Sequence, residues 1–192
     1  MYRQYGQVVA VTNRSLAKRP FPEQIKTVCE IHPDALILRE KDLTEEEYEK
    51  LAQEVMTICE AYQVPCILHT FWRAAEKLGC DTVHLPLPVF RQYAQKRKIQ
   101  RIGTSVHSIE QALEAQSLGA DYLTAGHIYV TDCKKGLEPR GLDFLRQVCS
   151  AVTIPVYAIG GIHFDETQWR ELQSCGAVGG CIMSGMMTLP VR

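Results

Sequence analysis

The sequence lacks several features that mark membrane or nucleic-acid-binding proteins. No apolar run approaches the roughly 20 residues that a membrane-spanning helix needs. Residues 1–6 show no apolar core of a signal peptide. The 21 Lys and Arg residues nearly balance 22 Asp and Glu residues, for a net charge of −1, so no bulk field favours nucleic acid or an anionic membrane. We therefore expect a cytoplasmic protein without a nucleic-acid or membrane partner.

The sequence also lacks the cysteine spacing of a redox or zinc motif, because its eight cysteines include no CxxC pair. Cys29, Cys59, Cys149 and Cys181 sit inside apolar periodic segments. In a chain of 192 residues, such cysteines are typical of buried free thiols in a reducing cytoplasm rather than of a disulfide framework.

What the sequence has is a regular alternation of short apolar runs and helical segments. Hydrophobic residues make up 46% and charged residues 22% of the chain, which fits one globular domain over residues 1–192. The apolar runs, expected as buried parallel strands, are 8–12, 35–39, 66–69, 82–85, 101–105, 121–125, 155–159 and 178–183. The expected helices are 21–31, 44–62, 72–78, 89–96, 108–118 and 142–148, with two more beginning near 165 and 184.

The helix over 44–62 gives the clearest signal, because Thr44 and Glu47 match a capping box. Eight strand–helix units with short connections predict an α/β fold, a closed (β/α)8 TIM barrel. A doubly wound open sheet is the alternative, but no GxGxxG turn follows the first strand.

In such a barrel, reactive side chains belong at the carboxyl ends of the strands. Arg39 and Lys41 follow the second strand two positions apart and can bind a carboxylate or phosphate; the alternative is a surface pair with Glu40 and Asp42. His127 follows the sixth strand, where a pKa near neutrality suits an imidazole to take and return a proton. The alternative is a loop histidine satisfied by the backbone.

The ends of the last two strands predict a phosphate site. Gly161 lies in a glycine pair that lets the backbone approach a ligand, and Ser184 opens a short helix whose free N–H groups favour an anion. Phosphate sites in such barrels commonly lie between these two loops. Glycine pairs also end strands for purely steric reasons, so that interpretation stays open.

Other reactive side chains give weaker signals. His69, His84 and His107 also fall at strand ends, but no tight metal-ligand spacing links them. We therefore expect no metal site. Cys133 lacks an accompanying Cys/His/Asn pattern, which makes it a weak candidate nucleophile.

Six short stretches carry a family pattern. They are 38–42 (Leu-Arg-Glu-Lys-Asp), 103–108 (Gly-Thr-Ser-Val-His-Ser), 119–122 (Gly-Ala-Asp-Tyr), 126–136 (Gly-His-Ile-Tyr-Val-Thr-Asp-Cys-Lys-Lys-Gly), 159–162 (Ile-Gly-Gly-Ile) and 183–184 (Met-Ser). Together they resemble the thiamine phosphate synthase superfamily over essentially the whole chain. Stretch 126–136 is similar to the TenI branch, the thiazole tautomerases, since synthases have a proline in place of His127 and a Thr-x-Thr-Lys run at 131–134.

The resemblance also shows what this chain lacks. Synthases carry an Asn-Asp pair at the end of the third strand and a further Asp after the fourth, which hold magnesium and the leaving pyrophosphate. Here the third strand ends in His69-Thr70, and residues 83–88 (Val-His-Leu-Pro-Leu-Pro) contain no carboxylate. A pyrophosphate-displacing enzyme needs that metal site, so we expect neither synthase activity nor a metal or other cofactor.

The resemblance implies a thiazole tautomerase, an isomerase of bacterial thiamine biosynthesis. Its substrate is a non-aromatic 2-carboxythiazole phosphate with an exocyclic double bond, and its product is the aromatic tautomer. A proton leaves ring carbon C2 and one arrives at the exocyclic carbon. His127 is the expected general base and acid, because one imidazole can do both in turn.

The resemblance further implies the substrate contacts. Those expected are Arg39 and Lys41 at the carboxylate or the developing charge, Thr131 and Lys134 over the ring and its tail, and Gly161, Met183 and Ser184 at the phosphate. Ser105 is a further expected substrate contact. The alternatives are a thiamine phosphate synthase-like enzyme and a non-catalytic regulatory or ligand-binding protein of TenI type. Barrels of this superfamily often pair, so a homodimer is a further expectation.

Overall fold

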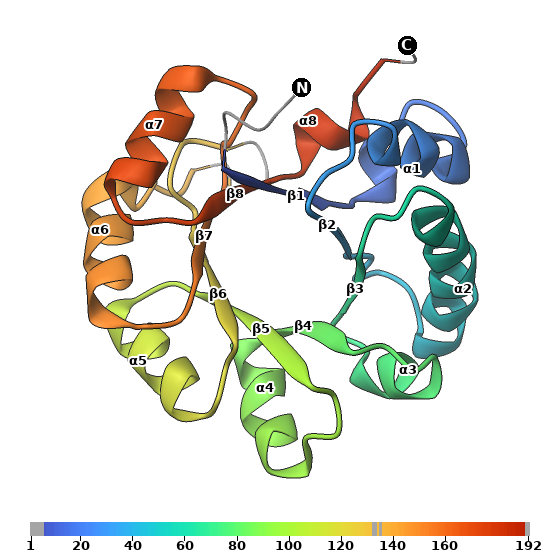
Figure 1. The fold of residues 1–192 in the computed structure, drawn as a ribbon, viewed down its shortest axis with the longest axis horizontal. Helices are drawn as coiled ribbons and strands as arrows, with labels where there is room; N and C mark the ends of the chain where they lie inside the picture. The colour runs from blue at the N-terminus through green and yellow to red at the C-terminus, as the bar shows by residue number, and fades with distance from the viewer. Residues whose placement is uncertain (1–5, 132–133, 135, 191–192) are drawn as a thin grey trace.

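Eight parallel strands form a closed barrel in the computed structural model, which describes residues 6–131, 134 and 136–190 (Figure 1). Each strand pairs with its sequence neighbours, and β8 closes the ring on β1. The strands are β1 (Gln7–Val11), β2 (Ala35–Leu38), β3 (Cys66–His69), β4 (Thr82–Pro86), β5 (Arg101–Val106), β6 (Tyr122–Gly126), β7 (Val156–Ile159) and β8 (Gly179–Ile182). The predicted (β/α)8 barrel is confirmed, and the open-sheet alternative is wrong.

Helices surround the strands on the outside of the ring (Figure 1). They are α1 (Phe21–Cys29), α2 (Glu45–Ala61), α3 (Trp72–Lys77), α4 (Leu87–Tyr93), α5 (Ile109–Ser117), α6 (Gly141–Ala151), α7 (Glu166–Ser174) and α8 (Ser184–Met187), with 3₁₀ turns η2 (Arg14–Leu16) and η3 (Ala94–Lys96). The predicted capping box of α2 is present in both directions between Thr44 and Glu47. Ser108 and Asp165 cap α5 and α7 through their side chains.

The largest differences from the predicted boundaries occur in helices α4 and α6. Helix α4 begins at Leu87, two residues before its predicted start, because Pro88 is tolerated in the first helical turn. Helix α6 spans Gly141–Ala151 instead of 142–148. Strand β6 includes Gly126, which pairs with Ile159 of β7, so the loop after β6 begins with His127.

The core has two parts because both faces of each strand are buried. Val8 and Ala10 of β1 join the large cluster between strands and helices, whereas Val9 and Val11 join a smaller cluster inside the barrel. Ile37 and Cys181 belong to the same interior cluster. Three side chains of this interior cluster, Val11, Ile37 and Cys181, also line a cavity at the carboxyl ends of the strands.

The described cysteines are free thiols, as predicted. Cys29, Cys59 and Cys181 are buried, whereas Cys149, also predicted to be buried, is half-buried at the surface of α6. Burial raises the pKa of the Cys181 thiol to about 12, which keeps it protonated. In the part of the chain that the structure describes, no helix is long and apolar enough to cross a membrane.

Candidate active site

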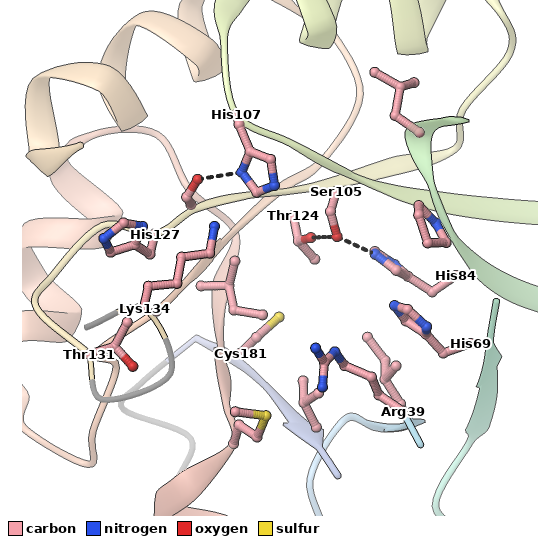
Figure 2. A pocket seen from close by; sticks show the side chains of 18 of the residues that line it. Arg39, His69, His84, Ser105, His107, Thr124, His127, Thr131, Lys134 and Cys181 are labelled. Atoms are coloured by element: carbon pink, nitrogen blue, oxygen red, sulfur yellow. Dashed lines mark hydrogen bonds between the residues drawn. The ribbon is translucent and has the colours of Figure 1, made fainter. Parts of the chain in front are cut away.

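A cavity of about 390 Å³ opens at the carboxyl ends of the barrel strands. Its wall combines residues from the ends of strands and from the loops that follow them (Figure 2). Every residue predicted for the site lines this cavity, namely Arg39, Lys41, Ser105, His127, Thr131, Lys134, Gly161, Met183 and Ser184. The fold thus brings the predicted residues together, although their chemical roles remain predictions.

Arg39 and Lys41 line the cavity because Glu40 between them is turned away. The buried Glu40 carboxylate accepts from the Thr12 hydroxyl at 2.6 Å and from the Arg14 backbone N–H at 3.0 Å. The Arg14 guanidinium lies 3.2 Å from Glu40. It also pairs with Asp42, 2.5 Å away. The alternative of a surface pair between Arg39, Lys41 and these carboxylates is therefore wrong, because Arg14 occupies them.

The cavity wall is positively charged. Partial removal from water lowers the pKa of the Lys41 ammonium, and repulsion from Arg39 and Lys134 lowers it further. Among the residues the structure describes, Arg39, Lys41 and Lys134 make no ion pair with a carboxylate. Arg91, which also lines the cavity, differs from these three cations because it forms a bidentate salt bridge with Glu114. The three unpaired cations suit an anionic ligand.

His127 is held by its own loop. Its carbonyl accepts from the Arg140 N–H at 2.9 Å, and the next N–H, of Ile128, donates to Ile159 at 3.0 Å. The side chain is only 6% exposed. Nε2 lies 3.4 Å from the Leu137 carbonyl, at the limit of a hydrogen bond, and Nδ1 is buried without a partner among the described residues. The interpretation of a histidine satisfied by the backbone thus accounts for Nε2 but not for Nδ1.

His84 and Ser105 belong to a hydrogen-bonded network in the cavity floor. The two ring nitrogens of His84 lie 2.9 Å from Ser105 Oγ and 3.2 Å from the Tyr122 hydroxyl, and Thr124 donates to Ser105 at 2.9 Å (Figure 2). Burial, and to a smaller extent Lys41, lowers the pKa of His84 to about 3. His84 is therefore neutral and serves as a hydrogen-bonding group.

His69 stacks on His84 with ring centroids 5.4 Å apart. Its Nδ1 lies 2.6 Å from the Thr70 hydroxyl. Burial lowers the pKa of His69 well below its usual range, with smaller contributions from His84 and the neighbouring cations Lys41 and Arg39. Two neutral imidazoles thus lie side by side on β3 and β4, in the wall of the cavity.

The described lining does not fit the magnesium of a synthase. Mg²⁺ prefers carboxylate and other oxygen ligands, yet the described residues around the cavity include no Asp or Glu. No group of three or more His, Cys, Asp or Glu side chains that could hold a metal occurs in residues 6–131, 134 and 136–190. Asp132 and Cys133 lie outside the described residues, so the interpretation of Cys133 stays a prediction.

The glycine pair after β7 contacts the chain itself. A Cβ at Gly160 would lie 2.3 Å from the His127 Cβ, and a Cβ at Gly161 would lie 2.5 Å from the Val130 carbonyl oxygen. The steric interpretation of this pair thus accounts for both glycines. Phosphate binding by the Gly161 backbone and by Ser184, the first residue of α8, stays a prediction.

Sequence reasoning missed several residues around the cavity. Thr124 and Cys181 face the barrel interior from β6 and β8, but alternation gives no signal in strands that are buried on both faces. Gln111 of α5 accepts from the His107 backbone N–H at 2.7 Å and also lines the cavity. The spacing of four residues from His107 to Gln111 is a signal that could have placed it.

Comparison with known proteins identifies the family. A family model described as thiamine monophosphate synthase matches residues 8–186. The chain belongs to this family. The "Thiamine-phosphate synthase 2" of Streptococcus pneumoniae is 32% identical over 193 positions, covering 97% of this chain and 90% of that protein. A solved "Thiamine phosphate pyrophosphorylase" from Pyrococcus furiosus superposes with a TM-score of 0.82 at 29% identity, covering 98% of this chain and 91% of that one.

Membership in the thiamine monophosphate synthase family confirms the predicted superfamily. It also supports the coarser part of the functional prediction, an enzyme family of thiamine biosynthesis. The relatives named above carry the names synthase and pyrophosphorylase, as does the "Thiamine-phosphate synthase" of Clostridium botulinum, which is 33% identical over 95% of this chain and 90% of that protein. These names favour the synthase-like alternative over the predicted tautomerase.

Proposed function

We propose that the protein is a thiazole tautomerase of thiamine biosynthesis, which aromatises a 2-carboxythiazole phosphate by proton transfer at His127. The observation that carries the proposal is His127, whose buried Nδ1 has no partner among the described residues. His127 lines a cavity whose described lining has cations and no carboxylate. Such a wall suits an anionic substrate and acid–base chemistry, and it lacks the ligands that a pyrophosphate-bound magnesium needs.

The proposed tautomerisation requires only a modest rate enhancement from acid–base catalysis. A proton leaves C2 and one arrives at the exocyclic carbon, and the ring becomes aromatic, which makes the reaction downhill. General acid–base catalysis by a positioned imidazole contributes about 10²- to 10⁴-fold. His127 is fixed by its loop and by contact with Gly160, so little reorganisation is required during the reaction.

In this proposal, the carboxylate and the phosphate of the substrate bind to two different parts of the cavity wall. Arg39 and Lys41 bind the carboxylate, where they also stabilise charge that develops when C2 loses its proton. Gly161, Met183 and Ser184 bind the phosphate, on the neighbouring wall formed after β7 and β8. The contacts proposed for the ring and its tail are Ser105, Thr131 and Lys134.

Thiamine-phosphate synthase activity is the second candidate, because the relatives carry that name. Its reaction would need a metal site elsewhere than the described cavity lining. A ligand-binding protein without turnover is the third candidate, and tight binding of the aromatic product without catalysis would favour it.

The first test is His127→Asn. We expect turnover of the non-aromatic thiazole phosphate to fall by about 10²- to 10⁴-fold, while affinity for the aromatic product, measured by calorimetry, stays close to that of the unchanged protein. His163→Asn is the matched control, because His163 is exposed and lies outside the cavity lining. Full activity in His127→Asn would contradict the assignment of the acid–base residue.

A further inference from the structure

His107 follows β5 and lines the same cavity as His127. Its Nδ1 lies 2.7 Å from the carbonyl oxygen of Gly126, the residue directly before His127 (Figure 2). A carbonyl oxygen only accepts hydrogen bonds, so Nδ1 must carry the proton. In the neutral imidazole, the second nitrogen, Nε2, then holds a lone pair.

The surroundings keep His107 neutral. Burial lowers its pKa, the hydrogen bond to Gly126 opposes this shift, and the charged or titratable neighbours Lys134, Arg140 and His127 lower the pKa further. Figure 2 shows the His107 ring near the Lys134 amino group, on the same side of the cavity as His127. His107 therefore offers a proton acceptor of fixed orientation in a positively charged wall.

A single imidazole would have to reach both carbons of the substrate in turn. Ring sulfur and C5 separate C2 from the exocyclic carbon, so the two proton transfers occur at different positions. His127 is confined, because its Cβ packs against Gly160 and the ring is buried. A second imidazole removes the need for the first to move between the two carbons.

We propose that His107 is a second acid–base residue of the cavity, which accepts at Nε2 the proton that leaves C2. This inference rests on the proposed tautomerase function and divides its proton transfers between two residues. His127, in its protonated form, delivers a proton to the exocyclic carbon.

The step balances without a cofactor or a redox change. The C2–H bond breaks and its electron pair becomes the C2=N3 double bond. The former C4=N3 pair moves to C4=C5, and the former exocyclic C=C pair forms the new C–H bond with the proton from His127. Afterwards solvent carries the extra proton from His107 back to His127.

The test follows hydrogen exchange at C2 in D₂O by proton NMR, with the non-aromatic 2-carboxythiazole phosphate as the probe. We expect His127→Asn to exchange the C2 proton faster than the enzyme-free rate while forming almost no product. We expect His107→Asn to lose this exchange and to lower turnover by roughly 10²-fold or more. In the unchanged protein, kcat/KM should fall as acid protonates His107, and this limb should be absent in His107→Asn.

The asparagine variant is chosen because its amide N–H can still donate to the Gly126 carbonyl while Nε2 is lost. A thermal unfolding midpoint and product affinity close to those of the unchanged protein check the fold, and His107→Gln carries the test if His107→Asn does not fold. His163→Asn should match the unchanged protein in both assays.

Two results would overturn the inference. One is unchanged turnover in His107→Asn, and the other is loss of C2 exchange in His127→Asn, because a single residue then performs both transfers. Neither result would remove the tautomerase activity of the unchanged protein. Absence of any conversion by the unchanged protein would instead refute the proposed function, and with it the assignment of the two proton transfers to His107 and His127.

Discussion

Gly160 shows how the absence of a side chain positions the proposed acid–base residue. The backbone of Gly160 has a φ of +96°, a conformation that favours glycine. A methyl group there would overlap the His127 Cβ at 2.3 Å. The β7 loop and the loop that carries His127 can therefore pack directly on each other.

We predict that Gly160→Ala lowers kcat/KM by roughly 10- to 100-fold, because the added Cβ displaces the imidazole. Gly79→Ala is the matched control. Its φ is +71° and no atom lies within 4 Å of the new Cβ, so it shares the backbone strain without touching the site. Steady-state kinetics of both variants check this, and equal kinetics would show that Gly160 does not position His127.

At the scale of single residues, the sequence predicted which side chains meet but not how they are held. Arg39 and Lys41 could be placed because they follow a strand end two positions apart. The clamp of Arg14 on Glu40 and Asp42 could not, because it joins loops that are separated by more than twenty residues. The fixed tautomer of His107 depends on the Gly126 carbonyl of a neighbouring strand, which no local pattern shows.

Helix α2 shows how local sequence signals can place the ends of an element. Thr44 accepts from the Glu47 N–H, and the Glu47 side chain accepts from the Thr44 N–H at 2.9 Å. Buried Tyr48, Ala52 and Val55 follow at helical spacing. Local capping and packing thus agree, which explains why both helix ends fall within one residue of the prediction.

We predict that Thr44→Ala lowers the free energy of unfolding by about 1 kcal/mol, since the cap of α2 is lost. This corresponds to a decrease in Tm of about 2–4 °C for a chain of this size. Thr57→Ala on the exposed face of α2 is the matched control, since it removes the same atoms without removing a cap. Calorimetry checks the difference, and an equal Tm for both variants would contradict it. Neither change should alter turnover.

The strand ends at the site carry fewer local signals than the ends of α2. Some of them differ from the prediction by one residue, because the end of a parallel strand depends on a partner that is remote in sequence. Gly126, for example, belongs to β6 through its pairing with Ile159. Described residues of the loops after β2 and β6 are held by contacts with remote segments, as Glu40 is by Arg14 and Ile128 by Ile159, and local sequence patterns do not show such contacts.

At the scale of the whole molecule, the net charge of the chain differs from the charge of the cavity wall. The net charge is −1, yet the described cavity wall presents Arg39, Lys41 and Lys134 and no carboxylate. Closure of the barrel gathers these cations from strand ends that lie far apart in the sequence. The homodimer, the cytoplasmic location and the lack of a cofactor remain predictions.

The central claim is metal-free proton transfer, and one paired NMR measurement tests it most directly. The protein is incubated in EDTA with the non-aromatic 2-carboxythiazole phosphate. A parallel sample receives Mg²⁺, a thiazole phosphate and a pyrimidine diphosphate. We predict formation of the aromatic tautomer well above the enzyme-free rate in EDTA, and no release of pyrophosphate in the parallel sample. Pyrophosphate release with Mg²⁺, without accelerated aromatisation in EDTA, would contradict the account and establish a synthase instead.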